Sequence, residues 1–136
     1  MIRPIVKDAF FLSQPSDDAT LMDMNAVRDL EDTLRANFAV CAGMAANMIG
    51  IRKKIAAVAL EPAVLILINP VIVSGKDPYE AEEGCLSLTG TRKTARYREI
   101  RVKYLDRSFK PKEQTFTGFI AQVIQHETDH FTGKLI

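Results

Sequence analysis

The stretch His126-Glu127-Thr128-Asp129-His130 lies six residues before the end of this 136-residue chain. Two histidines four positions apart on a helix share one face, so both imidazole rings can reach one metal ion. Glu127 would then stand beside that ion, where a water molecule needs a general base. The pattern predicts a metal-dependent hydrolase with its metal-binding helix near the C-terminus.

Two histidines do not complete a catalytic metal site, which usually has three protein ligands and one open position. Residues 131–136 contain no His, Asp, Glu or Cys, and the sequence has no other histidine. The third ligand is therefore expected upstream, from Cys41, Cys85 or an acidic side chain. We favour Cys85, because the preceding Gly84 allows a sharp turn that presents a thiolate. One Cys and two His suit Fe(II), Zn(II) or Ni(II).

Length and composition bound the remaining possibilities. The chain is 47% hydrophobic and 26% charged, which indicates one globular domain over residues 1–136. A net charge of +1 predicts no general attraction to DNA or to an anionic membrane. No segment approaches the ~18 apolar residues of a membrane span, and the first residues lack a secretory hydrophobic region. We therefore expect a cytoplasmic protein whose two cysteines are free thiols or metal ligands.

Hydrophobic periodicity predicts an α+β fold with mostly antiparallel sheets around a central C-terminal metal-binding helix. The predicted helices cover residues 22–38 and the segment from about 117 onward, and the predicted strands cover 55–60, 64–68 with a resumption at 71–73, 100–104 and 112–116. Residues 1–20 are expected as an extended arm, and 74–78 and 106–111 as loops. The small residues of 41–50 allow backbone to approach a ligand or another strand closely.

Three blocks of the sequence resemble motifs of the peptide deformylase family. Gly43-Met44-Ala45-Ala46 resembles part of G-x-G-[LM]-A-A-x-Q, and Glu83-Gly84-Cys85-Leu86-Ser87 is similar to E-G-C-L-S. The block that runs from Gln125 through His130 to Gly133 resembles Q-H-E-x-D-H-[LF]-x-G. Order and spacing agree, and the resemblance covers nearly the whole chain.

The resemblance implies an enzyme that removes the N-formyl group from the formyl-methionine of nascent bacterial polypeptides and releases formate. It implies Cys85, His126 and His130 as metal ligands, commonly of Fe(II), with Zn or Ni in isolated protein. Glu127 would move the protons, and the backbone N–H of Leu86 would stabilise the oxyanion. The positions that match the substrate-binding region are Ala42, Gly43, Arg92, Phe119, Gln122 and Val123. Gln122 is more polar than expected there, and a solvated strand residue explains Arg92 equally well.

Two positions of the first motif depart from the family pattern. Met48 replaces the glutamine that donates a hydrogen bond to the oxyanion, and a thioether cannot donate one. Loss of one such donor typically lowers turnover by roughly 10²–10³. Adjacent Asn47 or a bound water are the possible substitutes. Cys41 replaces the first glycine, and packing is the preferred interpretation of its side chain over oxidation or competition for the metal.

Two further hypotheses follow from these departures. The first is another amide hydrolase that uses the same metal centre on a different small amide. The second is a metal-binding protein that recognises peptide N-termini without turnover. Met48 is the residue that favours this hypothesis, because it lacks the hydrogen-bond donor of the motif glutamine. Intact Glu127 argues against the second, because a binding protein needs no general base.

A basic stretch between residues 92 and 107 could contact ribosomal RNA. Its members are Arg92, Lys93, Arg96, Arg98, Arg101, Lys103 and Arg107, with Tyr97 and Tyr104 interleaved. Arg101 and Lys103 alternate with apolar residues, however, so a solvated sheet face is the favoured interpretation.

Overall fold

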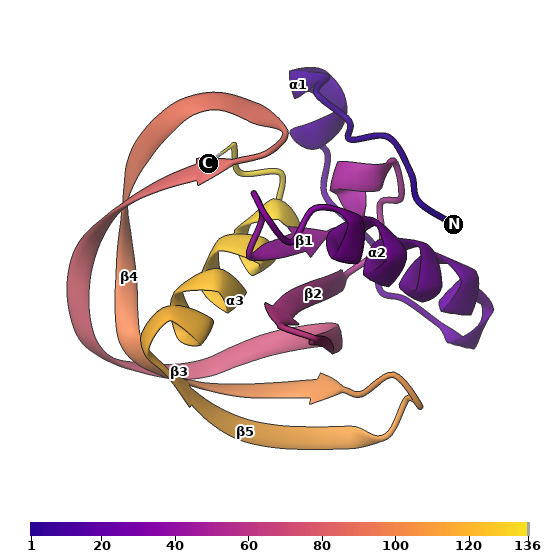
Figure 1. Cartoon of the computed structure of the whole chain (residues 1–136). Helices are drawn as coiled ribbons and strands as arrows, with labels where there is room; N and C mark the ends of the chain where they lie inside the picture. Colours follow the sequence, from indigo (N-terminus) through magenta and orange to yellow (C-terminus); the bar gives the residue numbers. More distant parts are fainter. Residues whose placement is uncertain (136) are drawn as a thin grey trace.

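The computed structural model, which describes residues 1–135, contains a five-stranded antiparallel sheet with one longer helix packed on each face (Figure 1). Three short helices precede or interrupt the strands. In chain order the elements are α1 (Ala9–Leu12), η1 (Leu21–Asp23), α2 (Met24–Ala36), β1 (Gly43–Ala45), η2 (Ala46–Ile49), β2 (Ile55–Leu60), β3 (Ala63–Cys85), β4 (Leu88–Leu105), β5 (Pro111–Thr117) and α3 (Gly118–His130). The strands lie in the order β1-β2-β3-β4-β5, and the expected α+β class is confirmed.

The sheet separates two hydrophobic cores because neighbouring strand residues point to opposite faces. On β1, Met44 packs with the α2 side, whereas Ala45 packs with the α3 side. On β2, Ala57 and Val58 divide in the same way. Both faces are covered, which explains why β2 is a nearly continuous apolar run.

The long hairpin of β3 and β4 curves around α3 (Figure 1). Its register shifts between Ile68 and Val71, between Ile72 and Ser74, and again between Gly84 and Cys85. Such irregularities bend a strand and increase its twist. The curvature carries the end of β3, with Cys85, back to the helix that holds the two histidines.

Several predicted boundaries differ from the structure. The helix predicted at 22–38 is divided into the 3₁₀ turn η1 and α2, and the strand of residues 112–116 is β5. The extended arm contains α1, which begins where the Asp8 carboxylate accepts a hydrogen bond from the Phe10 N–H at 2.9 Å. The loop predicted at 74–78 is wrong. These residues continue β3 and pair with β4. The backbone pairing between the two strands outweighs the local preference of this segment for a turn.

Within residues 1–135 the structure has no helix that is both long enough and apolar enough to span a membrane.

Candidate metal centre and active site

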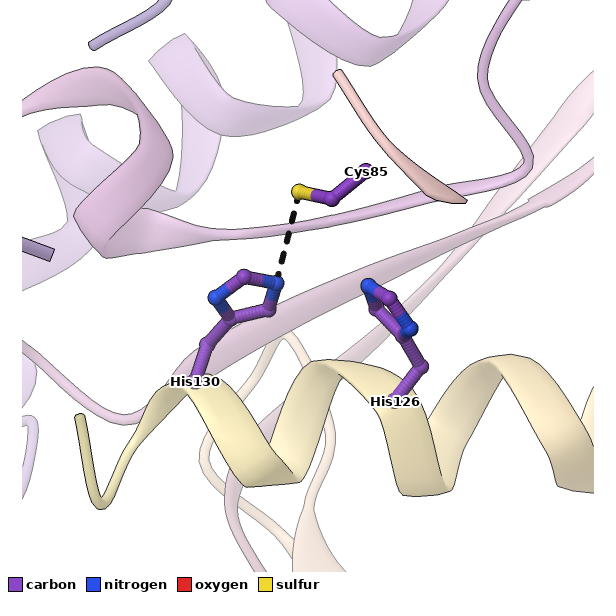
Figure 2. Close-up of side chains that lie close together, drawn as sticks. All are labelled: Cys85, His126 and His130. Carbon is purple, nitrogen blue, oxygen red and sulfur yellow. Dashed lines mark hydrogen bonds between the residues drawn. The ribbon is translucent and has the colours of Figure 1, made fainter. Parts of the chain in front are cut away.

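Cys85, His126 and His130 converge in three dimensions although the first two are 41 positions apart in the sequence. Their ligand atoms all lie within 4.8 Å of one another. Figure 2 shows the two imidazole rings rising from α3 toward the Cys85 thiol, whose Sγ lies 3.5 Å from Nε2 of His130. Both histidines are buried, and Cys85 is partly buried. One thiolate and two imidazoles at this spacing fit a transition-metal ion of the Fe(II), Zn(II) or Ni(II) type.

Glu83 orients His126 from behind the donor set. Its Oε1 lies 2.8 Å from Nδ1 of His126, so Nε2 is the imidazole nitrogen available to a metal. The Arg96 guanidinium binds both oxygens of Glu83, at 2.8 and 3.0 Å, and also binds Asp129 at 2.8 Å. Burial raises the pKa of Glu83, but the bonds to His126 and Arg96 outweigh burial and lower it to about 2. Glu83 is therefore a carboxylate anion beside His126 at neutral pH.

The same surroundings act differently on the two histidines. Burial lowers the pKa of His126, but hydrogen bonds to Cys85 and Glu83 outweigh it and raise this pKa to about 10. The pKa of His130 is lowered to about 3, mainly by burial and then by the positive charges of His126 and Arg96. Nδ1 of His130 is buried and makes no hydrogen bond to any described residue. His130 is thus a neutral imidazole, which is the form that binds metal ions.

Glu127 is buried beside the donor set without a neutralising partner. Its side chain is 4% exposed, and Oε1 lies 3.9 Å from Nε2 of His130. Among the described residues, nothing forms a hydrogen bond with this oxygen. Burial raises the pKa of Glu127 to about 7. A carboxylate with a pKa near neutrality can both accept and return a proton, which is what general acid–base catalysis requires.

A pocket of about 470 Å³ opens next to these groups. It is lined by five of the six predicted substrate positions, namely Ala42, Gly43, Phe119, Gln122 and Val123, and also by Cys85, Leu86, His126 and Glu127. Arg92 is not among the described residues that line it. Its guanidinium instead donates to the Thr89 carbonyl at 3.3 Å.

Met48 lines the pocket at the position of the motif glutamine and is 1% exposed. Its Sδ accepts a hydrogen bond from the Ala45 N–H at 3.5 Å. The side-chain amide of Asn47 points elsewhere, because it donates to the His130 carbonyl at 3.3 Å. This contact does not favour Asn47 as a substitute for the glutamine of the motif.

Cys41 also lines the pocket and is a free thiol. Its Sγ lies 2.8 Å from the Gly43 carbonyl, and burial raises its pKa to about 12. A thiol that stays protonated is a poor metal ligand and a poor nucleophile.

Sequence reasoning missed several residues that support the site. Glu83 could have been found from its place two residues before Cys85 in the E-G-C-L-S block. The side-chain amide of Gln125 forms two hydrogen bonds with the backbone of Tyr97. It accepts one from the Tyr97 N–H and donates one to the Tyr97 carbonyl, both at 2.8 Å. Arg96 was placed in the solvated basic stretch, which is wrong: it is 3% exposed. No local sequence pattern distinguishes Arg96 from the exposed basic residues of the same stretch.

The α+β fold, the largely buried Cys-His-His donor set and the adjacent glutamate define a metal-dependent hydrolase. Comparisons with known proteins specify the family. The family model described as polypeptide deformylase matches residues 2–136. A peptide deformylase of Clostridium beijerinckii is 56% identical over all 136 residues and is covered completely.

Solved structures agree with this result. A Met-Ala-Ser-bound class I type b peptide deformylase from Acinetobacter baumannii has a TM-score of 0.87 at 26% identity, with 99% of this chain and 97% of that chain covered. A peptide deformylase from Legionella pneumophila has a TM-score of 0.88 at 33% identity, with 99% and 83% covered. This chain belongs to the peptide deformylase family, whose enzymes are metal-dependent and remove the formyl group from nascent polypeptides.

Proposed function

We propose that this chain removes the formyl group from N-terminal formyl-methionine with a divalent metal held by Cys85, His126 and His130. The observation that carries the proposal is the convergence of three donor atoms within 4.8 Å, beside a pocket that also contains buried Glu127. When bound there, the metal supplies Lewis acidity toward water and toward a carbonyl oxygen. We propose Fe(II) as the ion in the cell, with Zn or Ni as alternatives in isolated protein.

Glu127 moves the protons of the reaction. As the carboxylate it takes a proton from the water that attacks the formyl carbon. As the carboxylic acid it then gives that proton to the amine that leaves. Because its Oε1 has no hydrogen-bond partner among residues 1–135, this oxygen is free for both transfers.

The oxyanion has fewer protein donors here than the family motif provides. We propose that the backbone N–H of Leu86, which lines the pocket, donates to it. Met48 occupies the position of the second donor and cannot contribute. We therefore expect this protein to turn over its substrate more slowly than a variant with glutamine at position 48.

The substrate methionine is assigned to the pocket wall formed by Ala42, Gly43, Phe119, Gln122 and Val123. Phe119 is 64% exposed and forms part of the rim, whereas Val123 is buried. Arg92 lies outside this pocket and is assigned only to peptide residues beyond it. Its contact with Thr89 does not favour that role.

Ribosome contact through the basic stretch has weaker support, because most of its charges are paired. Lys93 pairs with Glu80, and Arg101 and Lys103 pair with Glu113. Arg107 pairs with Glu31, and Arg96 is buried. Cytoplasmic location and a single domain over residues 1–136 also remain predictions.

The alternative hypotheses, a hydrolase of another small amide and a peptide-binding protein without turnover, are not favoured. The completely covered relative from Clostridium beijerinckii is a peptide deformylase. The geometry of Glu127 and the three donor atoms also supports turnover.

Formate release from formyl-Met-Ala-Ser tests the proposal. The protein is purified without oxygen in the presence of Fe(II), and the wild type is compared with Glu127→Ala. We expect release by the wild type and a loss of about 10²–10⁴ in the variant, because proton transfer is removed. Equal release by both proteins would contradict the assignment of Glu127.

A further inference from the structure

Gln122 is a neutral polar side chain in the otherwise apolar part of the pocket. The neighbouring lining residues are Val40, Ala42, Phe119 and Val123. Gln122 lies on α3, one helical turn before His126, so both side chains face the same pocket.

Two neighbours determine the orientation of the Gln122 amide. Its Nε2 donates to Oε2 of Glu83 at 3.0 Å, because a carboxylate can only accept. Its Oε1 consequently faces Tyr79, whose hydroxyl donates to it at 3.2 Å. Arg98 stacks over the Tyr79 ring, 4.4 Å from the centroid, and helps to hold the ring in place.

Among the residues that the structure describes, these two bonds leave one N–H of the Gln122 amide without an acceptor. An amide nitrogen carries two hydrogens, and Glu83 takes one. Gln122 lines the pocket, so its amide lies within reach of a bound side chain. The Glu83 carboxylate fixes which end of the amide is the NH₂ group, because Nε2 donates to it.

We propose that Gln122 determines specificity for the first side chain of the formyl peptide by donating its second N–H to an acceptor atom at the end of that side chain. Methionine offers a weakly accepting sulfur, and methionine sulfoxide offers a strongly accepting oxygen. The inference rests on the proposed function. It adds formyl peptides that begin with methionine sulfoxide as a substrate class.

The physical reason is the cost of an unpaired polar group. A hydrocarbon pocket would remove water from the sulfoxide oxygen and return no hydrogen bond. Gln122 returns one. Norleucine has a similar length but no acceptor, so it leaves this N–H unpaired.

The experiment compares three peptides on the Fe(II)-loaded enzyme: formyl-Met-Ala-Ser, formyl-norleucine-Ala-Ser and the sulfoxide form of the first. In Gln122→Met, which keeps the length of the side chain, we expect the sulfoxide-to-norleucine ratio of kcat/KM to fall by about tenfold. Because both peptides share one catalytic apparatus, a general loss of activity cancels in this ratio. Tyr79→Phe, which releases the amide, should lower the ratio by a smaller factor.

Phe119→Leu is the matched control, since it changes the shape of the same wall without changing its polarity. It should alter all three peptides by a similar factor. An unchanged ratio in Gln122→Met, or an equal fall of the ratio in Phe119→Leu, would overturn the proposal. If Gln122→Met does not fold, Gln122→Leu provides the same comparison.

Failure of the proposed function can be distinguished from failure of the proposal for Gln122. If the wild type releases formate from none of the peptides, the proposed function fails. The dissociation constants of Met-Ala-Ser and its sulfoxide, measured by calorimetry, then decide the role of Gln122. Selective weakening of the sulfoxide in Gln122→Met supports that role, and equal binding contradicts it.

Discussion

Met48 places a buried thioether at a position where the family motif has an amide donor. The Met48 sulfur is bound to the Ala45 N–H, which belongs to the backbone at the end of β1. A glutamine at position 48 could accept this bond through Oε1 and still present NH₂ toward the pocket. The backbone here is therefore compatible with the motif residue.

Met48→Gln is expected to raise turnover of formyl-Met-Ala-Ser by about 10², because it restores one oxyanion donor. Steady-state kcat on the Fe(II) enzyme measures the effect. Met48→Leu is the control, since leucine is apolar and adds no donor; it should not raise kcat. If the glutamine variant folds and turns over no faster than wild type, the oxyanion has another donor.

Close packing around Glu127, the proposed proton carrier, requires a glycine at position 43. A Cβ at this position would lie 2.4 Å from Cγ1 of Val123 and 3.1 Å from Oε2 of Glu127. We expect Gly43→Ala to displace both side chains and to lower kcat/KM by on the order of 10².

The matched control for this substitution is Gly84→Ala. A Cβ at Gly84 would make only ordinary contacts, the nearest at 3.5 Å. Gly84 does not have the positive φ that favours glycine, so alanine can adopt the backbone conformation before Cys85. Formate-release kinetics should show a much smaller loss for Gly84→Ala. Equal losses in the two variants would mean that the space beside Glu127 is not limiting.

Individual residues of the site differ in how far the sequence predicts them. Cys85 could be selected because residues 131–136 offer no ligand and Gly84 permits a turn. Arg96 could not be placed, because its burial depends on pairing with Glu83 from β3 and with Asp129 from α3. Those partners are brought together only by the tertiary fold.

Helix α2 is joined to the β4–β5 hairpin through Glu31. This carboxylate pairs with Arg35 one helical turn away and with Arg107 in the hairpin loop. Burial raises the pKa of Glu31, but the bonds to Arg107 and Arg35 outweigh it, so the net pKa is lowered from 4.5. The ion pairs therefore stabilise the fold above about pH 4.5 and lose this contribution as pH falls through the lowered pKa.

Glu31→Gln should reduce stability at pH 7 by about 1 kcal/mol, or about 3 °C in melting temperature. The difference from wild type should shrink as pH falls below 4.5. Thermal melts at several pH values measure it, with Glu61→Gln as a comparison from the β2–β3 turn. A difference that persists undiminished in acid would rule out the ion pairs as its cause.

Elements with a strong hydrophobic period were predicted well, and α2 and β2 agree closely with the ranges expected. The failure at residues 74–78 has a physical cause. Ser, Gly, Asp and Pro favour turns locally, but β4 runs alongside and Tyr97 packs directly over Gly75. Pairing across the sheet, which sequence periodicity does not report, overrides the local preference.

The fold as a whole assembles the candidate metal centre from two distant parts of the chain. The β3–β4 hairpin curves around α3 (Figure 1), and Cys85 at the end of β3 lies close to His126 and His130 of α3 (Figure 2). A site built in this way does not exist in the unfolded chain, so a metal ion bound there would stabilise the folded protein.

Metal content per chain in Cys85→Ser, measured after anaerobic purification with Fe(II), tests the proposed three-residue metal site most directly. Wild type should hold about one equivalent, and Cys41→Ser should match it, because Cys41 is a protonated thiol outside the donor set. Cys85→Ser should lose most of its metal and its formate release together. Full metal content in Cys85→Ser would contradict the assignment of Cys85 as a ligand.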